Sequence, residues 1–134
     1  MKCKKCKGVG AVKGDLNKWQ CGYVRCPSCS SIPLTFDQLR KTNEARCNND
    51  IRPLGSWTPL EWGACIAGET GELCNFLKKM KRGDIIDKQE LAHELADIIT
   101  YADLLAANLG IDLGKAVKEK FNIVSKRWKS KYKL

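Results

Sequence analysis

Long apolar runs and histidines are what this sequence of 134 residues most clearly lacks. No apolar run approaches the roughly 20 residues of a membrane-spanning helix, which excludes an integral membrane protein of that kind. The first residues, Met1 to Cys6, hold no apolar segment of the kind found in signal peptides, and we therefore expect a cytoplasmic protein. Histidine occurs only at position 93, so a di-iron carboxylate bundle, which needs two Glu-x-x-His motifs, is excluded by count.

The net charge of +9 is distributed unevenly along the chain. Residues 1–32 carry seven lysines and arginines against Asp15, and residues 115–134 carry eight against Glu119. Residues 33–114 are acidic, with thirteen Asp and Glu against nine Lys and Arg. An acidic centre between basic ends suits a metal site with phosphate-binding flanks, whereas basic ends alone also suit nonspecific contact with nucleic acid. Charge does not decide between the two.

Five of the eight cysteines lie in the first 29 residues, where four of them form two Cys-x-x-Cys pairs. Two such pairs at this separation are typical of a zinc ribbon, in which four thiolates hold one structural zinc ion. We therefore predict a zinc-ribbon module over residues 1–32, followed by a helical domain over 33–134. The predicted zinc ligands are Cys3, Cys6, Cys26 and Cys29, and Cys21 is a fifth candidate. The alternative is a set of reduced thiols in a flexible basic leader.

Helix start and stop signals divide the predicted helical domain into four segments. A polar N-cap residue with a partner three positions later marks a helix start, and a glycine often follows a helix end. Such capping pairs are Thr35 with Gln38, Thr58 with Glu61, and Asp87 with Glu90; Asp112 is a further N-cap, and Gly83 and Gly110 are stops. We predict helices over about 36–49, 59–82, 88–109 and 113–128, with no strand pattern after residue 33. Short connections between four helices predict an all-α fold, a four-helix bundle.

Two pairs of carboxylates lie on the second and third predicted helices. They are Glu69 with Glu72, and Glu94 with Asp97. A spacing of three residues places both side chains of a pair on one helix face, about one turn apart. Four converging carboxylates form an oxygen cage for a hard divalent cation such as Mg²⁺. The alternative is an ordinary solvated helix face.

Three glycines lie inside the second predicted helix, at positions 63, 68 and 71. Each costs about 1 kcal/mol relative to alanine. Two of them flank Glu69, and we expect a neighbouring helix or a ligand to come close there.

Several stretches resemble the MazG-like all-α nucleoside triphosphate pyrophosphohydrolases, a superfamily that includes the dCTP pyrophosphatases. They are Trp57-Thr58-Pro59-Leu60-Glu61-Trp62, Ala67-Gly68-Glu69-Thr70-Gly71-Glu72-Leu73, Glu94-Leu95-Ala96-Asp97-Ile98-Ile99-Thr100-Tyr101, and Lys120-Phe121-Asn122-x-x-Ser125-x-Arg127. The resemblance covers residues 35–134 and gives no support to the ribbon.

This resemblance implies Mg²⁺-dependent hydrolysis of a nucleoside triphosphate to a monophosphate and pyrophosphate, in control of the nucleotide pool. It implies a homodimer or homotetramer, with Mg²⁺ bound by Glu69, Glu72, Glu94 and Asp97. Lys120, Asn122 and Arg127 would contact phosphates or ribose; their alternative is a solvated basic helix. Candidates for base recognition are Tyr101, Trp57 and Trp62, which could stack on the base, and Asn43 and Arg46 from the first helix. For each aromatic the alternative is a place in the core.

A second hypothesis is a nucleic-acid-binding zinc-ribbon protein whose helical domain only dimerises. The basic ribbon and the lysine-rich end support it, with Trp19 and Tyr23 able to stack on bases. A third hypothesis is that zinc only stabilises a short N-terminal extension.

Overall fold

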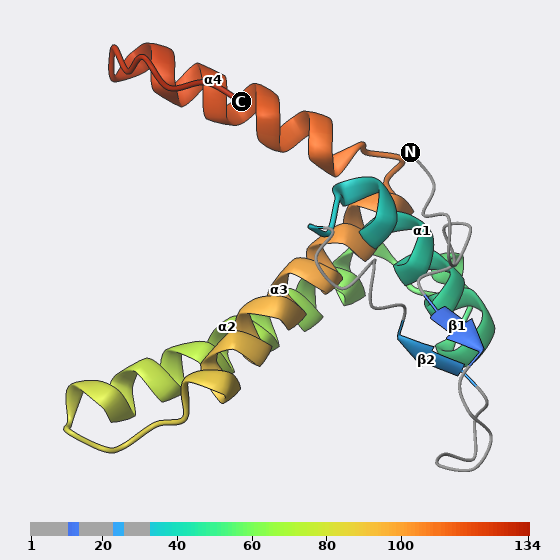
Figure 1. Cartoon of the computed structure of the whole chain (residues 1–134), viewed down its shortest axis with the longest axis horizontal. Helices are drawn as coiled ribbons and strands as arrows, with labels where there is room; N and C mark the ends of the chain where they lie inside the picture. The colour runs from blue at the N-terminus through green and yellow to red at the C-terminus, as the bar shows by residue number, and fades with distance from the viewer. Residues whose placement is uncertain (1–10, 14–22, 26–32) are drawn as a thin grey trace. The chain divides into compact units, whose positions relative to one another are not determined.

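The computed structural model describes residues 11–13, 23–25 and 33–134 (Figure 1). The chain divides into two compact units, Met1–Leu34 and Thr35–Leu134. The predicted zinc ligands Cys3, Cys6, Cys26 and Cys29 lie outside the described residues, as does Cys21. The zinc ribbon therefore stays a prediction.

The described part of the first unit is a two-stranded antiparallel sheet. Strand β1, Ala11–Lys13, pairs with strand β2, Tyr23–Arg25. Val12 lies opposite Val24 at the centre of the ladder. The sequence predicts an all-helical fold only for the residues after 33. Every secondary-structure element of the second unit is a helix, as predicted.

Helix α1, Phe36–Arg46, starts at the predicted N-cap. The Gln38 amide donates to Thr35 Oγ1 at 3.2 Å, and the Thr35 amide donates to Gln38 Oε1 at 3.0 Å. This reciprocal pair confirms the predicted capping box, which satisfies two backbone donors that the first helical turn leaves free.

The end of α1 differs from the prediction. The α-helix stops at Arg46 instead of about 49, and the chain continues as a π-helix, η1, over Cys47–Ile51. A short 3-10 helix, η2, follows over Leu54–Ser56, and its first amide donates to Asn48 Oδ1 at 2.7 Å. The segment therefore turns the chain from α1 into the next long helix.

Helices α2, Pro59–Lys81, and α3, Lys88–Asn108, pack along each other as an antiparallel hairpin (Figure 1). The predicted capping box of α2 is confirmed, since the Thr58 amide donates to Glu61 Oε2 at 2.7 Å and the Thr58 side chain accepts from the Glu61 amide. Gly83 follows α2 with a φ of +94°, a left-handed conformation that favours glycine. The hairpin turn is thus fixed where the sequence predicted it.

The start of α3 corrects one detail of the sequence analysis. Asp87 is the N-cap, but its carboxylate accepts from the Gln89 amide at 2.9 Å, and Glu90 forms no reciprocal bond. The helix ends before Gly110, whose φ is +67°. Helix α4, Leu113–Arg127, then begins at Asp112, which accepts from the Lys115 amide at 2.9 Å.

The core of the second unit is small and lies where η1, α2 and α3 meet. Its buried members Cys47, Trp62 and Leu104 are packed against partly buried apolar neighbours: Leu54, Trp57, Tyr101 and Leu105. Trp62 is 2% exposed. No described helix is long and apolar enough to cross a membrane.

The predicted four-helix bundle is not closed within one chain. The principal helix contact of α4 is with α1, not with α2 or α3, and in Figure 1 α4 (red) extends away from the hairpin. At that contact, a Cβ added to Gly114 would lie 3.0 Å from Phe36 Cβ, so glycine permits the close approach. Large apolar side chains of the hairpin and of α4 are consequently exposed, among them Leu77, Met80, Leu95, Ile99, Phe121 and Trp128.

Candidate active site

The hairpin brings three of the four predicted metal ligands together. Glu69 and Glu72 come from α2, and Glu94 comes from α3. One carboxylate oxygen of each lies within 4.8 Å of the others. The geometry follows from sequence, because a spacing of three residues aligns the α2 pair and the antiparallel turn returns α3 along that face.

One carboxylate oxygen of Glu94, Oε2, is buried without a hydrogen-bond partner among the residues that the structure describes. A buried polar atom without a partner is costly, and such atoms in native proteins often mark a functional site or a bound ion. This oxygen is therefore available to a ligand.

The carboxylates also disturb one another electrostatically. Burial raises the pKa of the Glu69 carboxyl, and the nearby negative charges of Asp97, Glu72 and Glu94 raise it further. Asp97 is thus close enough to act on Glu69, although it lies outside the tight triplet. Like charges that repel in this way are stabilised by a cation between them.

The donor set fits a hard divalent cation. All the converging atoms are carboxylate oxygens, the ligands that Mg²⁺ takes, and Glu94 also has a buried, unsatisfied oxygen. Glu69, Glu72 and Glu94 are the residues that would hold such an ion, with Asp97 beside them. Imidazole and thiolate ligands, which softer metals prefer, are missing from the group.

Comparison with protein families gives this geometry its context. Residues 58–130 match the MazG nucleotide pyrophosphohydrolase domain. The chain belongs to this family. No curated protein matches the chain. The match spans α2, α3 and α4 and includes all four carboxylates. The MazG domain indicates a hydrolase of the nucleotide pyrophosphohydrolase type, and the acidic group inside it is a possible site for a divalent metal.

Tyr101 lies beside the carboxylates of the MazG domain, on the same helix as Glu94. Burial raises the pKa of its phenol, and Cys65, Glu69 and Asp97 raise it further, whereas Arg46 lowers it. The ring of Tyr101 is also 6.4 Å from that of Trp62, centroid to centroid. Tyr101 therefore links the acidic group to the aromatic core.

The two predicted stacking tryptophans have different surroundings. Trp62 is buried, and its Nε1 donates to the Leu54 carbonyl at 3.3 Å, so the structure places it in the core. Trp57 is partly exposed, with its ring centroid 4.8 Å from that of Trp62. The guanidinium of Arg52 lies 3.8 Å from the Trp57 ring centroid, in a cation–π contact. Sequence analysis missed Arg52, because its partner is five residues away in a segment without helical periodicity.

Asn43 and Arg46 of α1 belong to a hydrogen-bonded network with α3. The buried Asn43 amide donates to the Thr100 carbonyl at 2.8 Å and to Asp103 Oδ2 at 3.2 Å, while Asn43 Oδ1 accepts from Arg46 at 3.0 Å. Asn43 is thus committed to packing, and its Oδ1 holds Arg46, whose positive charge lowers the pKa of Tyr101.

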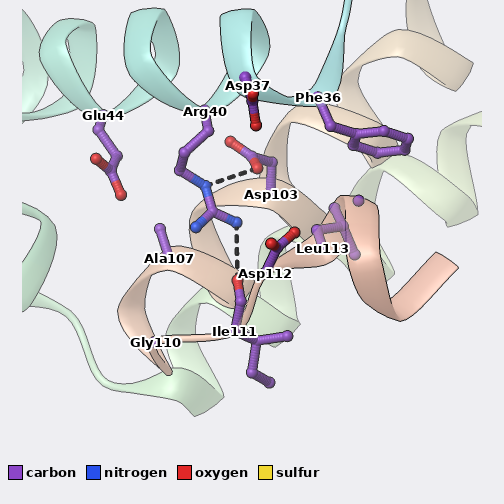
Figure 2. Close-up of a pocket in the computed structure, with 11 residues that line it drawn as sticks. Phe36, Asp37, Arg40, Glu44, Asp103, Ala107, Gly110, Ile111, Asp112 and Leu113 are labelled. Carbon is purple, nitrogen blue, oxygen red and sulfur yellow. Dashed lines mark hydrogen bonds and ion pairs between the residues drawn. The ribbon is translucent and has the colours of Figure 1, made fainter. Parts of the chain in front are cut away.

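Two residues of this network were missed by sequence analysis. Arg40 Nε donates to Asp103 Oδ1 at 2.8 Å, and Arg40 Nη2 donates to the Ile111 carbonyl at 3.1 Å (Figure 2). Arg40 and Asp103 both line a cleft of about 400 Å³ between α1 and the turn from α3 to α4. The only signal in the sequence was an aspartate next to the apolar Leu104 on the core face of α3.

The three predicted phosphate contacts on α4 are not brought to the carboxylates within one chain. Lys120 and Arg127 are exposed. Asn122 bonds instead to the backbone of Leu134. Because the principal contact of α4 is with α1, the structure leaves these residues apart from the acidic group.

Proposed function

We propose that this MazG domain hydrolyses a nucleoside triphosphate between its α and β phosphates. The oxygen of water bonds to the α phosphorus, the bond from that phosphorus to the bridging oxygen breaks, and pyrophosphate leaves. The products are a nucleoside monophosphate, pyrophosphate and a proton. The observation that carries the proposal is the triplet Glu69, Glu72 and Glu94, with its unsatisfied buried oxygen, inside the matched domain.

The four carboxylates would hold Mg²⁺. When bound, the ion supplies positive charge that offsets the negative charge developing on the phosphate oxygens. Glu69 and Glu72 are the two candidates to accept a proton from the attacking water.

Substrate recognition would use residues around the acidic group. Tyr101 and Trp57 are the candidates to contact the base, because both rings are only partly buried. Tyr101 lies near the carboxylates, and Trp57 packs against Trp62. Arg46, held by Asn43, adds a positive charge on the Tyr101 side. Trp62 supports these rings from the core.

A homodimer or homotetramer would complete the domain. The small core and the exposed apolar side chains of α2, α3 and α4 support an assembly of several copies. In such an assembly, α4 of one copy can bring Lys120 and Arg127 to the carboxylates of another. This would supply the phosphate contacts that one chain lacks.

The test is pyrophosphate release from a panel of canonical and modified dNTPs and NTPs, with and without Mg²⁺. We expect Mg²⁺-dependent release from at least one triphosphate. Glu72→Gln and Glu94→Gln should each lower kcat by about 100-fold or more, the size seen when a group that stabilises transition-state charge is removed. The panel would identify the preferred base and sugar.

Glu119→Gln is the matched control. Glu119 is exposed on α4, and its one ion pair in the described part of the chain is with Lys115, at 4.0 Å. Its loss should leave kcat within about twofold of the original value. Circular dichroism would check that every variant is folded. Folded protein that turns over no triphosphate, or a Glu72→Gln variant with full activity, would refute the proposal.

A further inference from the structure

The chain beyond α4 folds back along the helix. The Leu134 amide donates to Asn122 Oδ1 at 3.1 Å, and Asn122 Nδ2 donates to the Leu134 carbonyl at 3.2 Å. The turn is made at Lys129, whose φ is +51°, and the Ser130 amide donates to the Ser125 carbonyl at 2.8 Å. One side chain of α4 thus fixes the backbone of the tail, residues 129–134.

A hollow of about 710 Å³ lies between the tail and α4. It is lined by Asn122, Ile123, Lys126, Lys129, Ser130 and Lys133. Its three lysines are exposed, and no described acidic residue lines it. The one acidic residue of 115–134 is Glu119, which pairs with Lys115. The hollow therefore carries three positive side-chain charges.

The hollow and the apolar stripe occupy different faces of α4. Val117, Phe121 and Val124 recur at helical spacing and define the stripe. Asn122 and Lys126 lie one turn apart on a face turned away from it. Another copy that covers the stripe would leave the hollow open to solvent.

We propose that this hollow, the tail hollow, binds the sugar-phosphate backbone of single-stranded nucleic acid. Exposed lysines hold a single small anion weakly, because water and salt screen each contact. A polymer instead contacts all three lysines at once and releases several counterions. The chemistry of the hollow therefore fits a chain of phosphates better than a free phosphate.

The neighbouring aromatic favours a single strand over a duplex. Tyr132 is 68% exposed and lies in the sequence between Ser130 and Lys133, which line the hollow, although Tyr132 itself does not. The Lys131 amine lies 5.4 Å from the centroid of its ring. Proteins that bind single strands without sequence preference combine a positive groove with exposed aromatic rings, since an unpaired base can stack on such a ring. A base inside a duplex cannot reach it in this way.

The experiment is fluorescence anisotropy with the full chain and a labelled oligothymidylate, without added Mg²⁺ or triphosphate, over a series of salt concentrations. The variant Lys126→Gln/Lys129→Gln/Lys133→Gln should bind at least about 10-fold more weakly. Its slope of log affinity against log salt should become shallower by about 2, as expected for the loss of three phosphate contacts to a single strand. Binding as tight, and as salt-dependent, as that of the unmodified chain would overturn the proposal.

The matched control is Lys78→Gln/Lys79→Gln/Lys81→Gln, which removes the same charge from the end of α2. It should keep the affinity within about threefold of the original if the tail hollow is the site, and an equal loss would reduce the effect to net charge and overturn the proposal. Tyr132→Ala should weaken binding of the single strand by about 5-fold or more and leave duplex binding unchanged.

Two further measurements test whether the folded-back tail forms the site and whether the ligand is a polymer or a small anion. Asn122→Ala keeps every lysine but releases the tail, so a drop in affinity is expected only if the folded-back tail forms the site. Excess pyrophosphate should compete weakly; if it displaces the oligonucleotide stoichiometrically, the hollow is a small-anion site and the proposal fails. Triphosphate hydrolysis, measured separately, reports on the carboxylates and does not affect this outcome.

Discussion

Arg40 and Asp103 form an ion pair across 63 positions of sequence, with 2.8 Å between Arg40 Nε and Asp103 Oδ1. The Asp103 side chain is 1% exposed, and it also accepts a hydrogen bond from Asn43. A carboxylate buried to this extent requires partners, because its desolvation is otherwise uncompensated. The pair therefore ties α1 to the helix that carries Glu94 and Asp97.

Arg40→Ala should destabilise the fold by about 3 kcal/mol, since it leaves a buried carboxylate with only the Asn43 amide. Urea unfolding would measure the loss. Arg82→Ala is the control, because the Arg82–Asp84 pair is exposed and should contribute less than about 1 kcal/mol. Equal losses in the two variants would contradict the assigned role of Asp103.

Glu69→Gln should stabilise the metal-free protein at neutral pH. The pKa of Glu69 is raised in the folded state, so between its ordinary value and the folded value the unfolded chain binds fewer protons. Stability therefore falls as pH rises through this window, and glutamine, which carries no charge, removes that loss. Thermal unfolding between about pH 4 and 8 without added divalent metal would show it.

The same variant should gain less from Mg²⁺ than the unmodified chain, because a ligand that binds the native state more weakly raises Tm by a smaller amount. Thermal unfolding in a Mg²⁺ series provides this comparison. A Glu69→Gln protein that is less stable at pH 7 without metal would contradict the repulsion assigned to the cluster.

The glycines of α2 and of the α3–α4 turn should respond to alanine in opposite directions. A Cβ at Gly63 meets no described atom within 4 Å, so Gly63→Ala should raise stability by about 0.5–1 kcal/mol. Gly110 has a φ of +67°, and Gly110→Ala should cost about 1 kcal/mol or more. Urea midpoints at constant m-value would measure both.

Gly68 and Gly71, the glycines near Glu69, are as open as Gly63 in one chain. Of the two neighbours expected there, a helix or a ligand, no helix of the described chain comes close. If Gly63→Ala instead weakens self-association or metal-dependent activity without lowering stability, a second copy or a ligand approaches that face.

Phe121→Gln should shift the protein to a smaller species. Phe121 belongs to the apolar stripe of α4 and is 42% exposed in the single chain. Ile123→Gln is the control, since Ile123 is 56% exposed but lies on the side of the tail hollow. Light scattering after size exclusion would give the masses, and an unchanged mass for Phe121→Gln would argue against assembly through this stripe.

Local signals in the sequence predicted the helix starts and the convergence of Glu69, Glu72 and Glu94. The residues 58 to 61 determine the start of α2 by themselves, and the spacing of Glu69 and Glu72 determines their common face. The turn at Gly83 then brings Glu94 opposite them. These features depend on neighbours a few residues apart, which is why one sequence sufficed.

Features that depend on distant partners were not predictable in the same way. The π-helix after α1 has no composition signal, and Asp103 is an acidic residue whose partner lies in another helix. The periodicity of α4 shows that one face needs covering, but it does not say by what. The four predicted helices are present, but the packing of α4 was not predictable from the sequence for this reason.

The α2–α3 hairpin also has a consequence for the order of folding. Its two helices are adjacent in sequence, separated only by residues 82–87, and α2 begins with its own capping box. Closing so short a loop costs little chain entropy, whereas the Arg40–Asp103 pair must close a loop of 63 residues. We expect the hairpin, and with it the carboxylate triplet, to form early, and α1 to dock onto it late in the folding reaction.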